Sequence, residues 1–522
     1  PRMRLEEKPM PCPAGAWLAN VLALLTLLLL PLYMPTGYVK LVDAKFWLLL
    51  WLAGAGTVVV LLGWAVSRAK GQRRGLPRLD ATWLPLPVLC LSYTIAWLMA
   101  EDRRTALWGL AGRHNGLVML LACTALYLLV RRFGGGIPAG YYGRLLAGAG
   151  CVVTLLCWAN FFMLDPLGVY YTFLPETGKL FLGPVGNINF YGAYLTVCLP
   201  LAAWELMTVN DRADVLLWGT AAVCLGSGLI AAGSDAAWLG AFCAVAVLCM
   251  ARTVTGSRLA RLCAAGAVWA VCALAAGFAA AHLPIRDELR TISGFVCRPW
   301  AAALLAIAFG AAALLLRGRK ALRSWRFMRG LGVVLVLGAA VAVAAANLTA
   351  VPLGPLEDVL RFSDSWGSNR GFAWQRLWQV WRDDITPMQK LFGLGGDAAA
   401  ARLKIDDYSI KYMILLNGET FDSAHNEYLQ HLVCGGAVGL AAWLAFLVVS
   451  IRKGLRTAPG LAAAIFGYAV QAFFSISMPG VLPLVFVLAA LCGQPRPVAA
   501  RGWYRCLAGA AAAAPLLWML AG

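Results

Sequence analysis

Apolar stretches of about 20 residues recur along the whole sequence, and they constrain the fold more than any other feature. A helix of that length crosses the hydrocarbon core of a bilayer, which is about 30 Å thick. We predict a membrane-spanning helix from each stretch. The predicted spans cover residues 16–37, 46–66, 81–100, 116–130, 145–164, 189–208, 215–232, 235–251, 263–283, 299–316, 331–350, 425–451, 460–478, 479–495 and 506–521.

The composition supports this reading, because 61% of the residues are hydrophobic and only 13% are charged. Soluble domains carry roughly 25% charged residues. We therefore predict an all-α polytopic integral membrane protein with about 14 transmembrane helices, within a range of about 12 to 15, forming a single membrane domain over 1–522. The run from Ala16 to Thr36 is long enough to span and lacks a cleavage site after it, so we interpret it as the first span rather than a signal peptide.

Lysine and arginine are distributed unevenly between the two sets of connecting segments. With the N-terminus inside, the short cytoplasmic segments carry 27 of them and the short outer loops carry 9. The long segment 351–424 carries 8, and long loops do not follow the positive-inside rule. This bias predicts a cytoplasmic N-terminus in the cytoplasmic (inner) membrane, with 351–424 and His425 on the outer face. It also explains the net charge of +19 without a nucleic-acid partner.

Several kinds of site lack support in the sequence. The predicted spans contain few charges, since Glu205 and Asp235 lie near span ends, and this argues against a proton-coupled transporter. The fifteen Cys show no paired framework, and with only four His we predict no disulfide, no metal site and no cofactor. The run FGLGGD at 392–397 lacks the GK[ST] of a phosphate loop and predicts a tight turn.

The long polar loop contains an amphipathic pattern that predicts a helix over 368–382, with Ser368 or Asn369 as its N-cap. Arg370 falls at the N-terminal end of the apolar stripe of this helix, where free backbone N–H groups and a guanidinium favour an anion. The alternative is that Arg370 only extends along the membrane surface and pairs with a lipid phosphate. The stripe consists of Trp374, Leu377, Trp378 and Trp381.

His425 opens the predicted span 425–451, with Asp422 or Ser423 as its N-cap, and so is expected in the first helical turn. The positive end of the helix disfavours an imidazolium there. A neutral imidazole can act as a general base near pH 7. The alternative is an interfacial His that bonds a loop carbonyl. His431 lies on another face of the helix and is predicted to be a packed polar residue.

A second outer loop, EDRRTALWGLAGRHNG, holds further candidates. Arg113 and His114 lie near its end, and Glu101 and Asp102 begin it. A carboxylate just outside a span could serve as a base in place of His425. The alternative for this loop is ordinary interfacial charge.

Three motifs resemble those of the bacterial O-antigen ligase and O-antigen polymerase superfamily. GRHNGL at 112–117 is similar to a GR-x-x-G-L motif, and GPVGNINFYGAYL at 183–195 is similar to a span entry that includes Asn187 and Asn189. AHNEYLQHLVCGGAVG at 424–439 fits the family's His motif through His425, Asn426, Gly436 and Gly439. The Arg370-x-x-x-Trp374 helix followed by LFGLGGD is also similar to the family's long-loop pattern.

The resemblance implies a core of about 81–495 that transfers a glycan from an undecaprenyl-diphosphate-linked donor to an acceptor hydroxyl of a glycan or glycolipid, without a metal. It implies that His425 activates the acceptor and that Arg370 and Arg113 hold the diphosphate. Trp374 offers an aromatic face to sugar. One departure is that this chain has Ser234-Asp235-Ala236 where many members have Ser-Arg-Gly. Polymerisation of chains, and a flippase or transporter of lipid-linked glycans, stay open as alternatives.

Overall fold

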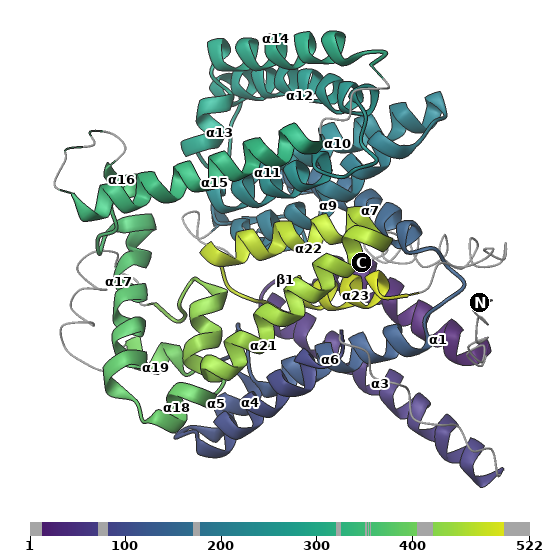
Figure 1. The fold of residues 1–522 in the computed structure, drawn as a ribbon, viewed down its shortest axis with the longest axis vertical. Helices are drawn as coiled ribbons and strands as arrows, with labels where there is room; N and C mark the ends of the chain where they lie inside the picture. The colour runs from purple at the N-terminus through teal and green to yellow at the C-terminus, as the bar shows by residue number, and fades with distance from the viewer. Residues whose placement is uncertain are drawn as a thin grey trace.

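The chain folds into an all-α membrane protein whose long helices run roughly side by side (Figure 1). The computed structural model describes residues 13–70, 82–170, 178–319, 325–349, 352, 354, 357–403 and 421–494. Within these ranges, nine helices are long and apolar enough to cross a membrane. They are α1 (Pro13–Leu24) continued by η1 (Leu25–Leu29) and α2 (Leu30–Leu32), α3 (Leu41–Ala69), α7 (Ala139–Phe161), α9 (Ile188–Thr208), α10 (Arg212–Ala232), α12 (Gly256–His282), α14 (Pro299–Leu316), α15 (Trp325–Leu348) and α21 (Glu427–Thr457).

Five further helices coincide with predicted spans but are shorter. They are α4 (Pro85–Met99), α6 (Leu117–Phe133), α11 (Asp235–Cys249), α22 (Pro459–Gln471) with its 3-10 extension η4 (Ala472–Phe474), and α23 (Leu482–Cys492). Fourteen of the predicted spans therefore correspond to helices of the structure, and the all-α polytopic class is confirmed. The fifteenth predicted span, 506–521, lies outside the described residues.

Helix α9 forms the centre of the helix bundle. It packs against α7, α10, α11 and α22, and 89% of its apolar window is buried. Helix α15 is the opposite case, with only 6% of its window buried. Its exposed side chains, such as Val334 and Leu337, are apolar and suit contact with lipid tails. Helices α12 and α14 pair with each other at the top of Figure 1 and expose similar faces.

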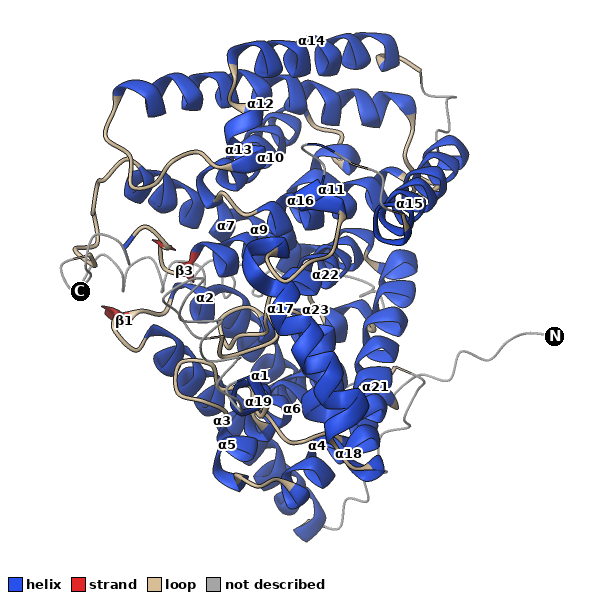
Figure 2. Cartoon of the chain, turned by 90° about the vertical axis from the view of Figure 1, so that its left-hand side faces the viewer, coloured by secondary structure: helices blue, strands red, loops and turns tan. Residues whose placement is uncertain are grey.

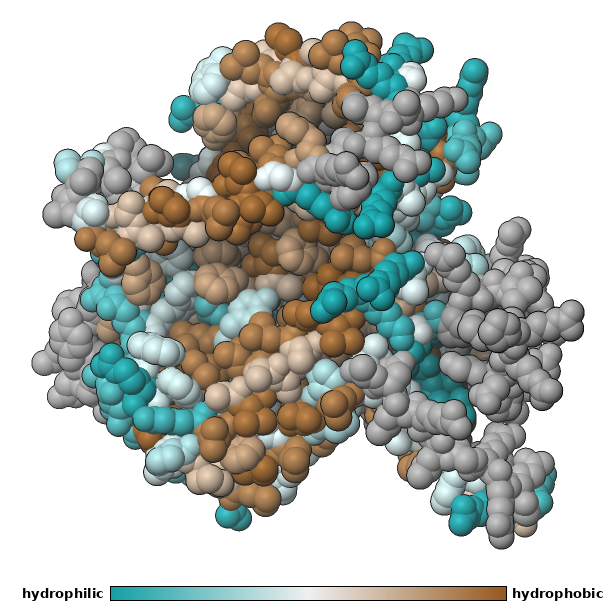
Figure 3. All heavy atoms as spheres, viewed as in Figure 1, coloured by the Kyte–Doolittle hydropathy of each residue, from teal (hydrophilic) through white to brown (hydrophobic). Residues whose placement is uncertain are grey.

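The surface in view is hydrophobic in the middle and hydrophilic along its left and right edges (Figure 3). Because the long helices run roughly from left to right, these edges correspond to the two membrane interfaces. The left edge carries the short elements of the loops predicted to face outside, so we call it the outer edge, and Figure 2 looks onto it. These elements are β1 (Pro35–Tyr38), the antiparallel pair β2 (Phe181–Leu182) and β3 (Gly186–Asn187), α5 (Arg103–Trp108), α13 (Thr291–Val296), α16 (Glu357–Leu360), α17 (Trp366–Gln379), η3 (Val380–Asp384), α18 (Pro387–Phe392) and α19 (Ala399–Leu403).

Local sequence explains how several of these short elements begin. At the start of α18, the Thr386 side chain accepts the Gln389 N–H while the Gln389 side chain accepts the Thr386 N–H, which forms a capping box. Pro387 occupies the first helical position, where a backbone N–H would have no partner within the helix, so its missing N–H costs nothing there. Asp102 caps α5 by accepting the backbone N–H groups of Arg104 and Thr105. The chain thus turns sharply along the outer edge without leaving these helix ends unpaired.

Candidate active site

His425 lies immediately before α21 rather than inside its first turn. Asn426 is the N-cap, because its side chain accepts the N–H groups of Tyr428 and Leu429 at 3.0 Å each. The prediction that Asp422 or Ser423 caps this helix, with His425 in the first turn, is therefore wrong. His425 has a φ of 46°, a left-handed conformation that is costly for a residue with a Cβ. Such a conformation at a polar, half-buried residue is typical of functional sites.

Helix α21 is interrupted at Gly436, and the long loop inserts there. Gly436 has a φ of 68°, and a Cβ on it would lie 2.3 Å from the carbonyl of Leu391. The interruption leaves the carbonyls of Val433 and Cys434 without partners in the helix. Val433 O accepts the Leu394 N–H and Cys434 O accepts the Gly395 N–H, at 3.0 Å each. The FGLGGD run does form a tight turn, but its larger effect is to join the long loop to the N-terminal third of α21.

Asp397, the last residue of that run, fastens a second outer loop to the same place. Its carboxylate accepts the N–H groups of Leu110 at 2.9 Å and Asn115 at 3.0 Å. Burial raises the pKa of Asp397, and these two hydrogen bonds oppose the shift. Asp397 is not a predicted site residue. An acidic residue that ends a glycine-rich run is the only local signal for it, since both partners are more than 280 positions away.

Through this contact the GRHNG loop reaches the segment before His425. Arg113 forms a two-pronged ion pair with Asp422, with Nε–Oδ2 at 2.7 Å and Nη2–Oδ1 at 3.0 Å. His114 is held elsewhere, because it bonds Asp43 and stacks on the Phe46 ring at 4.1 Å. Arg113 therefore lies close enough to His425 to act on it electrostatically, but its charge is paired with a carboxylate three residues before that histidine.

Helix α17 lies along the outer edge and contacts the same segment from the other side (Figure 2). The Trp374 Nε1–H donates to Ala424 O at 2.8 Å, one residue before His425. Its ring also packs against Trp366 and Phe473, at 5.2 Å and 5.4 Å between centroids. Trp374 is thus already enclosed by aromatic side chains, and its described contacts hold the His425 segment in place.

The buried face of α17 differs from the predicted stripe. Gly367, Ser368 and Asn369 have left-handed dihedrals, so the regular helix begins only at Arg370. Trp378 is 48% exposed and stacks on Trp381 instead of facing inward. The packed face is centred on Gly371, where a Cβ would lie 1.8 Å from Ser363 O. Close backbone contact at Gly371, rather than the tryptophan spacing, sets the rotation of this helix. Its other buried residues are Phe372, Ala373 and Leu377, and Val380 of η3 continues this face.

His425, Arg370 and Arg113 form one electrostatic group. Burial, then Arg370, then Arg113 lower the pKa of His425 to about 4, and Asp422 opposes the shift. Burial lowers the pKa of Arg370 below its ordinary value, and Asp235 opposes that shift. Among the ion pairs of the described residues, none involves Arg370. The site therefore contains a neutral imidazole at pH 7 and a partly buried cation near it.

The span entry of α9 reaches the same region through Ser234. Asn187 caps α9 by accepting the Asn189 N–H at 2.9 Å. The Asn189 side chain accepts the Ser234 Oγ–H at 3.0 Å. The next residue, Asp235, accepts hydrogen bonds from Thr291 Oγ1 at 2.5 Å and Ile292 N at 3.4 Å. The departure from the Ser-Arg-Gly pattern thus places a carboxylate, Asp235, in the electrostatic surroundings of Arg370.

Glu101 and Asp102 have other partners. Glu101 pairs with Arg402 at 2.8 Å, and its side chain is 81% exposed. Asp102 caps α5 and also accepts the Thr105 Oγ–H at 2.6 Å. These hydrogen bonds lower the pKa of Asp102, which makes it a weaker base. No interaction found in the described ranges joins either carboxylate to His425.

Neither metal-binding groups nor disulfides occur in the part of the chain that the structure describes. No group of three or more His, Cys, Asp or Glu side chains gathers there, and the thirteen cysteines within it are free. His431 is a packed polar residue, as predicted, with Nδ1 at 2.8 Å from the Tyr93 hydroxyl.

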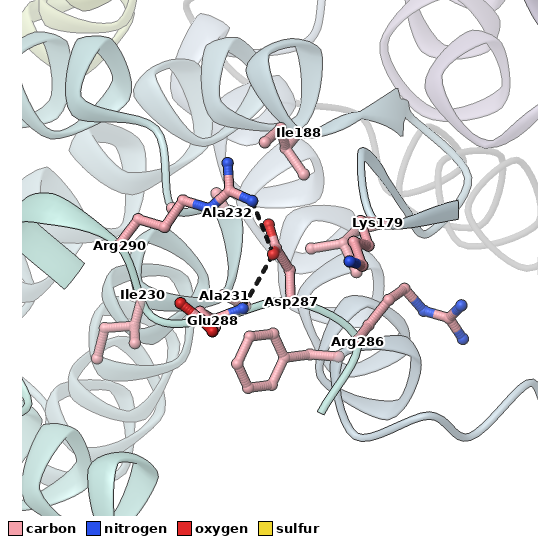
Figure 4. A pocket seen from close by; sticks show the side chains of 12 residues that line it. Lys179, Ile188, Ile230, Ala231, Ala232, Arg286, Asp287, Glu288 and Arg290 are labelled. Atoms are coloured by element: carbon pink, nitrogen blue, oxygen red, sulfur yellow. Dashed lines mark hydrogen bonds and ion pairs between the residues drawn. The ribbon is translucent and has the colours of Figure 1, made fainter. Parts of the chain in front are cut away.

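A small cavity lies near the outer ends of α7, α9 and α10 (Figure 4). Its volume is about 20 Å³, which is room for about one water molecule. Arg290 reaches toward Asp287 and donates to it at 2.9 Å, and Arg286 lies over the Tyr170 ring at 3.4 Å. This cavity is too small for a sugar or a diphosphate.

Comparison with known proteins finds a match over a segment that includes several of the candidate site residues. Residues 300–444 match the protein-family model described as O-antigen ligase. The matched segment runs from α14 into α21 and includes Arg370, Trp374 and His425. No match was found among the curated proteins. The family match confirms the predicted resemblance to the O-antigen ligase superfamily over residues 300–444.

Proposed function

We propose that the protein transfers a glycan from an undecaprenyl-diphosphate-linked donor to an acceptor hydroxyl of a glycan or glycolipid, on the outer side of the cytoplasmic membrane. The observation that carries this proposal is the group around His425. A half-buried imidazole whose pKa is lowered to about 4 lies in the field of Arg370 and of the Arg113–Asp422 pair. A neutral base next to a cation fits a reaction that takes a proton from one reactant and expels an anion from the other.

In the proposed step, the acceptor oxygen forms a bond to the anomeric carbon of the donor glycan. The bond from that carbon to the diphosphate oxygen breaks, and its electron pair leaves with the polyprenyl diphosphate. The acceptor hydroxyl proton passes to a ring nitrogen of His425. Arg370 holds the developing charge on the diphosphate, because a guanidinium can donate two parallel hydrogen bonds to phosphate oxygens.

The other site residues have supporting roles in this proposal. Arg113 contributes through the segment before His425, because Asp422 already accepts bonds from its Nε and Nη2. The third guanidinium nitrogen of Arg113, Nη1, takes no part in those two bonds, and in this proposal it donates to the diphosphate. Asn426 fixes the start of α21, and Trp374 fixes Ala424. Gly436 allows the long loop to insert, and Gly439 faces Ser92, whose Oγ would lie 3.5 Å from a Cβ at that position.

Two alternatives differ in what they transfer or move. A polymerase would use the same chemistry with a second lipid-linked glycan as the acceptor. A flippase would need no base and would be insensitive to loss of His425. The arrangement around His425 favours transferase chemistry over transport.

The test of this proposal is a transfer reaction with purified protein in lipid nanodiscs and a polyprenyl-diphosphate glycan as the donor. The acceptor is either a glycolipid core or a second lipid-linked glycan, and the products are identified by mass spectrometry. Transfer to the glycolipid indicates ligation, and lengthening of the lipid-linked glycan indicates polymerisation. No glycosylated product with any acceptor would refute the transferase proposal. A parallel reaction with EDTA tests metal independence, and loss of turnover restored by magnesium would contradict it.

A further inference from the structure

A large cationic cavity lies at the membrane interface opposite to His425. The uninterrupted part of α21 after Gly436, residues 437–457, is roughly 30 Å long at 1.5 Å per residue, and it separates this cavity from the segment around His425. The cavity is lined by the last turns of α21 and has a volume of about 1340 Å³. That exceeds a typical small-ligand pocket of roughly 300–1000 Å³. It is therefore a separate feature from the proposed catalytic group.

Four guanidinium groups from two helices and a connecting segment converge on this cavity. Arg452 and Arg456 lie one turn apart near the end of α21, Arg252 follows α11, and Arg329 belongs to the first turns of α15. All four are exposed. The one carboxylate of the lining, Glu205, already pairs with Arg144, with an oxygen–nitrogen distance of 2.7 Å. Among the described lining residues, four guanidinium groups thus stand against one carboxylate.

The walls below these charges are apolar. They include Leu201 and Trp204 of α9, Val247 of α11, and Leu461 of α22. The first turns of α7 and α22 also open onto the cavity, and neither has a side-chain cap. Uncapped helix N-termini favour anions. A positive rim above apolar walls matches an amphiphile with an anionic head and hydrocarbon chains.

We propose that this cavity binds the phosphate head group of an anionic phospholipid, with the acyl chains against the apolar walls. The positive-inside bias alone requires basic residues in the loops of one face, but not their convergence on one cavity from separate elements. The proposal is independent of the glycan-transfer proposal, because it concerns the other interface and can be measured without donor or acceptor.

Native mass spectrometry measures how much of each lipid stays bound to the purified full chain after release from nanodiscs that contain phosphatidylglycerol or phosphatidylcholine. The difference between the two lipids gives the preference for an anionic head group. A guanidinium near an anionic lipid is worth roughly a fivefold factor, so Arg452→Gln with Arg456→Gln should weaken phosphatidylglycerol binding roughly 30-fold. The matched control is Arg212→Gln with Arg317→Gln, since both residues are exposed and neither lines the cavity. The control should bind like the unmodified protein.

Three outcomes would overturn the proposal. They are equal binding of the two lipids, an equal loss in both double variants, and displacement of phosphatidylglycerol by millimolar inorganic phosphate, which would assign a soluble anion to the site. If the cavity variant does not fold, the unmodified protein is photo-cross-linked to an anionic lipid with a diazirine in its chain. Adducts should map to the cavity walls around Trp204, and adducts confined to other helices would contradict the assignment.

Discussion

The two ends of α21 hold charged side chains in different ways. At the start of the helix, Arg113 is paired with Asp422, Asp397 accepts two backbone N–H groups, and His425 is half-buried between segments that are hydrogen-bonded on both sides. At the other end, Arg452 and Arg456 are exposed around an open cavity. The first arrangement shifts the pKa of an imidazole and fixes its position, as proton transfer requires. The second presents charge to whatever anion enters, as binding requires.

The largest expected effect is at the start of α21. His425→Ala should lower turnover about 10²–10⁴-fold, the usual contribution of a general base, or roughly 3–5 kcal/mol of barrier. His431→Ala is the matched control, because His431 bonds Tyr93 inside the bundle and lies in α21 itself. It should reduce stability more than turnover. Turnover is measured with a fluorescent acceptor, at equal amounts of inserted protein.

The opposite result has a clear meaning. If both His substitutions lower turnover equally, or if the His425→Ala protein does not accumulate in the membrane, His425 is a structural residue. Glu101 is then the next candidate base, since Asp102 is committed to capping α5.

The second expected effect concerns the insertion of the long loop. Gly436→Ala places a Cβ at 2.3 Å from the Leu391 carbonyl in a left-handed conformation, so we expect a loss of about 3 kcal/mol or more in stability. Gly439→Ala, whose Cβ would lie 3.5 Å from Ser92 Oγ, should change stability by less than about 1 kcal/mol. Thermal unfolding in detergent measures both. Equal unfolding temperatures would mean that the loop does not depend on the interruption.

The third expected effect tests Arg370 against the snorkelling alternative. Arg370→Ala should raise the KM for donor and lower turnover by roughly 10–100-fold in kcat/KM, as expected for a hydrogen bond to a charged group. Arg370→Lys should restore only part of this, because lysine lacks the planar fork. Arg382→Ala is the control, since its exposed guanidinium pairs with Asp383. Unchanged donor dependence in Arg370→Ala would assign Arg370 to the membrane surface.

The fold was predictable to a larger extent than the site. Apolar runs located fourteen helices, because each span needs a run of this kind whatever it packs against. The start of α21 was not predictable, because Asp422, Ser423 and Asn426 are all good capping residues within five positions. Asp422 does not cap the helix because it pairs with Arg113, which is 309 residues away in the sequence. Contacts of such separation leave no periodic signal in the sequence.

The same limit explains the error in α17. The spacing of the tryptophans predicted that Trp378 lies on the buried face of α17. The close contact between Gly371 and the backbone of Ser363 instead rotates the helix so that the Gly371 face is buried and Trp378 is exposed. A glycine's close contact depends on its partner, and the sequence does not name that partner. The residues that fasten the site, such as Asp397 and Gly395, belong to the same class.

The smallest effect concerns the pKa of His425, and it separates electrostatic contact from mere proximity. In the free protein the pKa is about 4, so the imidazole is neutral above that pH and becomes charged as the pH falls through it. Arg370→Gln removes one of the two cations that lower this pKa, so the pKa should rise toward 6.5 by a fraction of a unit to about one unit. Arg382→Gln should leave it unchanged.

Diethyl pyrocarbonate reacts with neutral imidazole, so its rate of modification at His425, read by mass against pH, reports this pKa without requiring turnover. A bound diphosphate should act like Arg370→Gln, because its negative charge opposes both cations. The acid limb of kcat, which reports the donor complex, is then expected at a higher pH than that of kcat/KM, which reports the free protein. Donor binding would thereby strengthen His425 as a base only when the leaving group is in place. If the two limbs coincide, and Arg370→Gln does not move the modification curve, the diphosphate binds away from His425 and Arg370 has no part in its electrostatics.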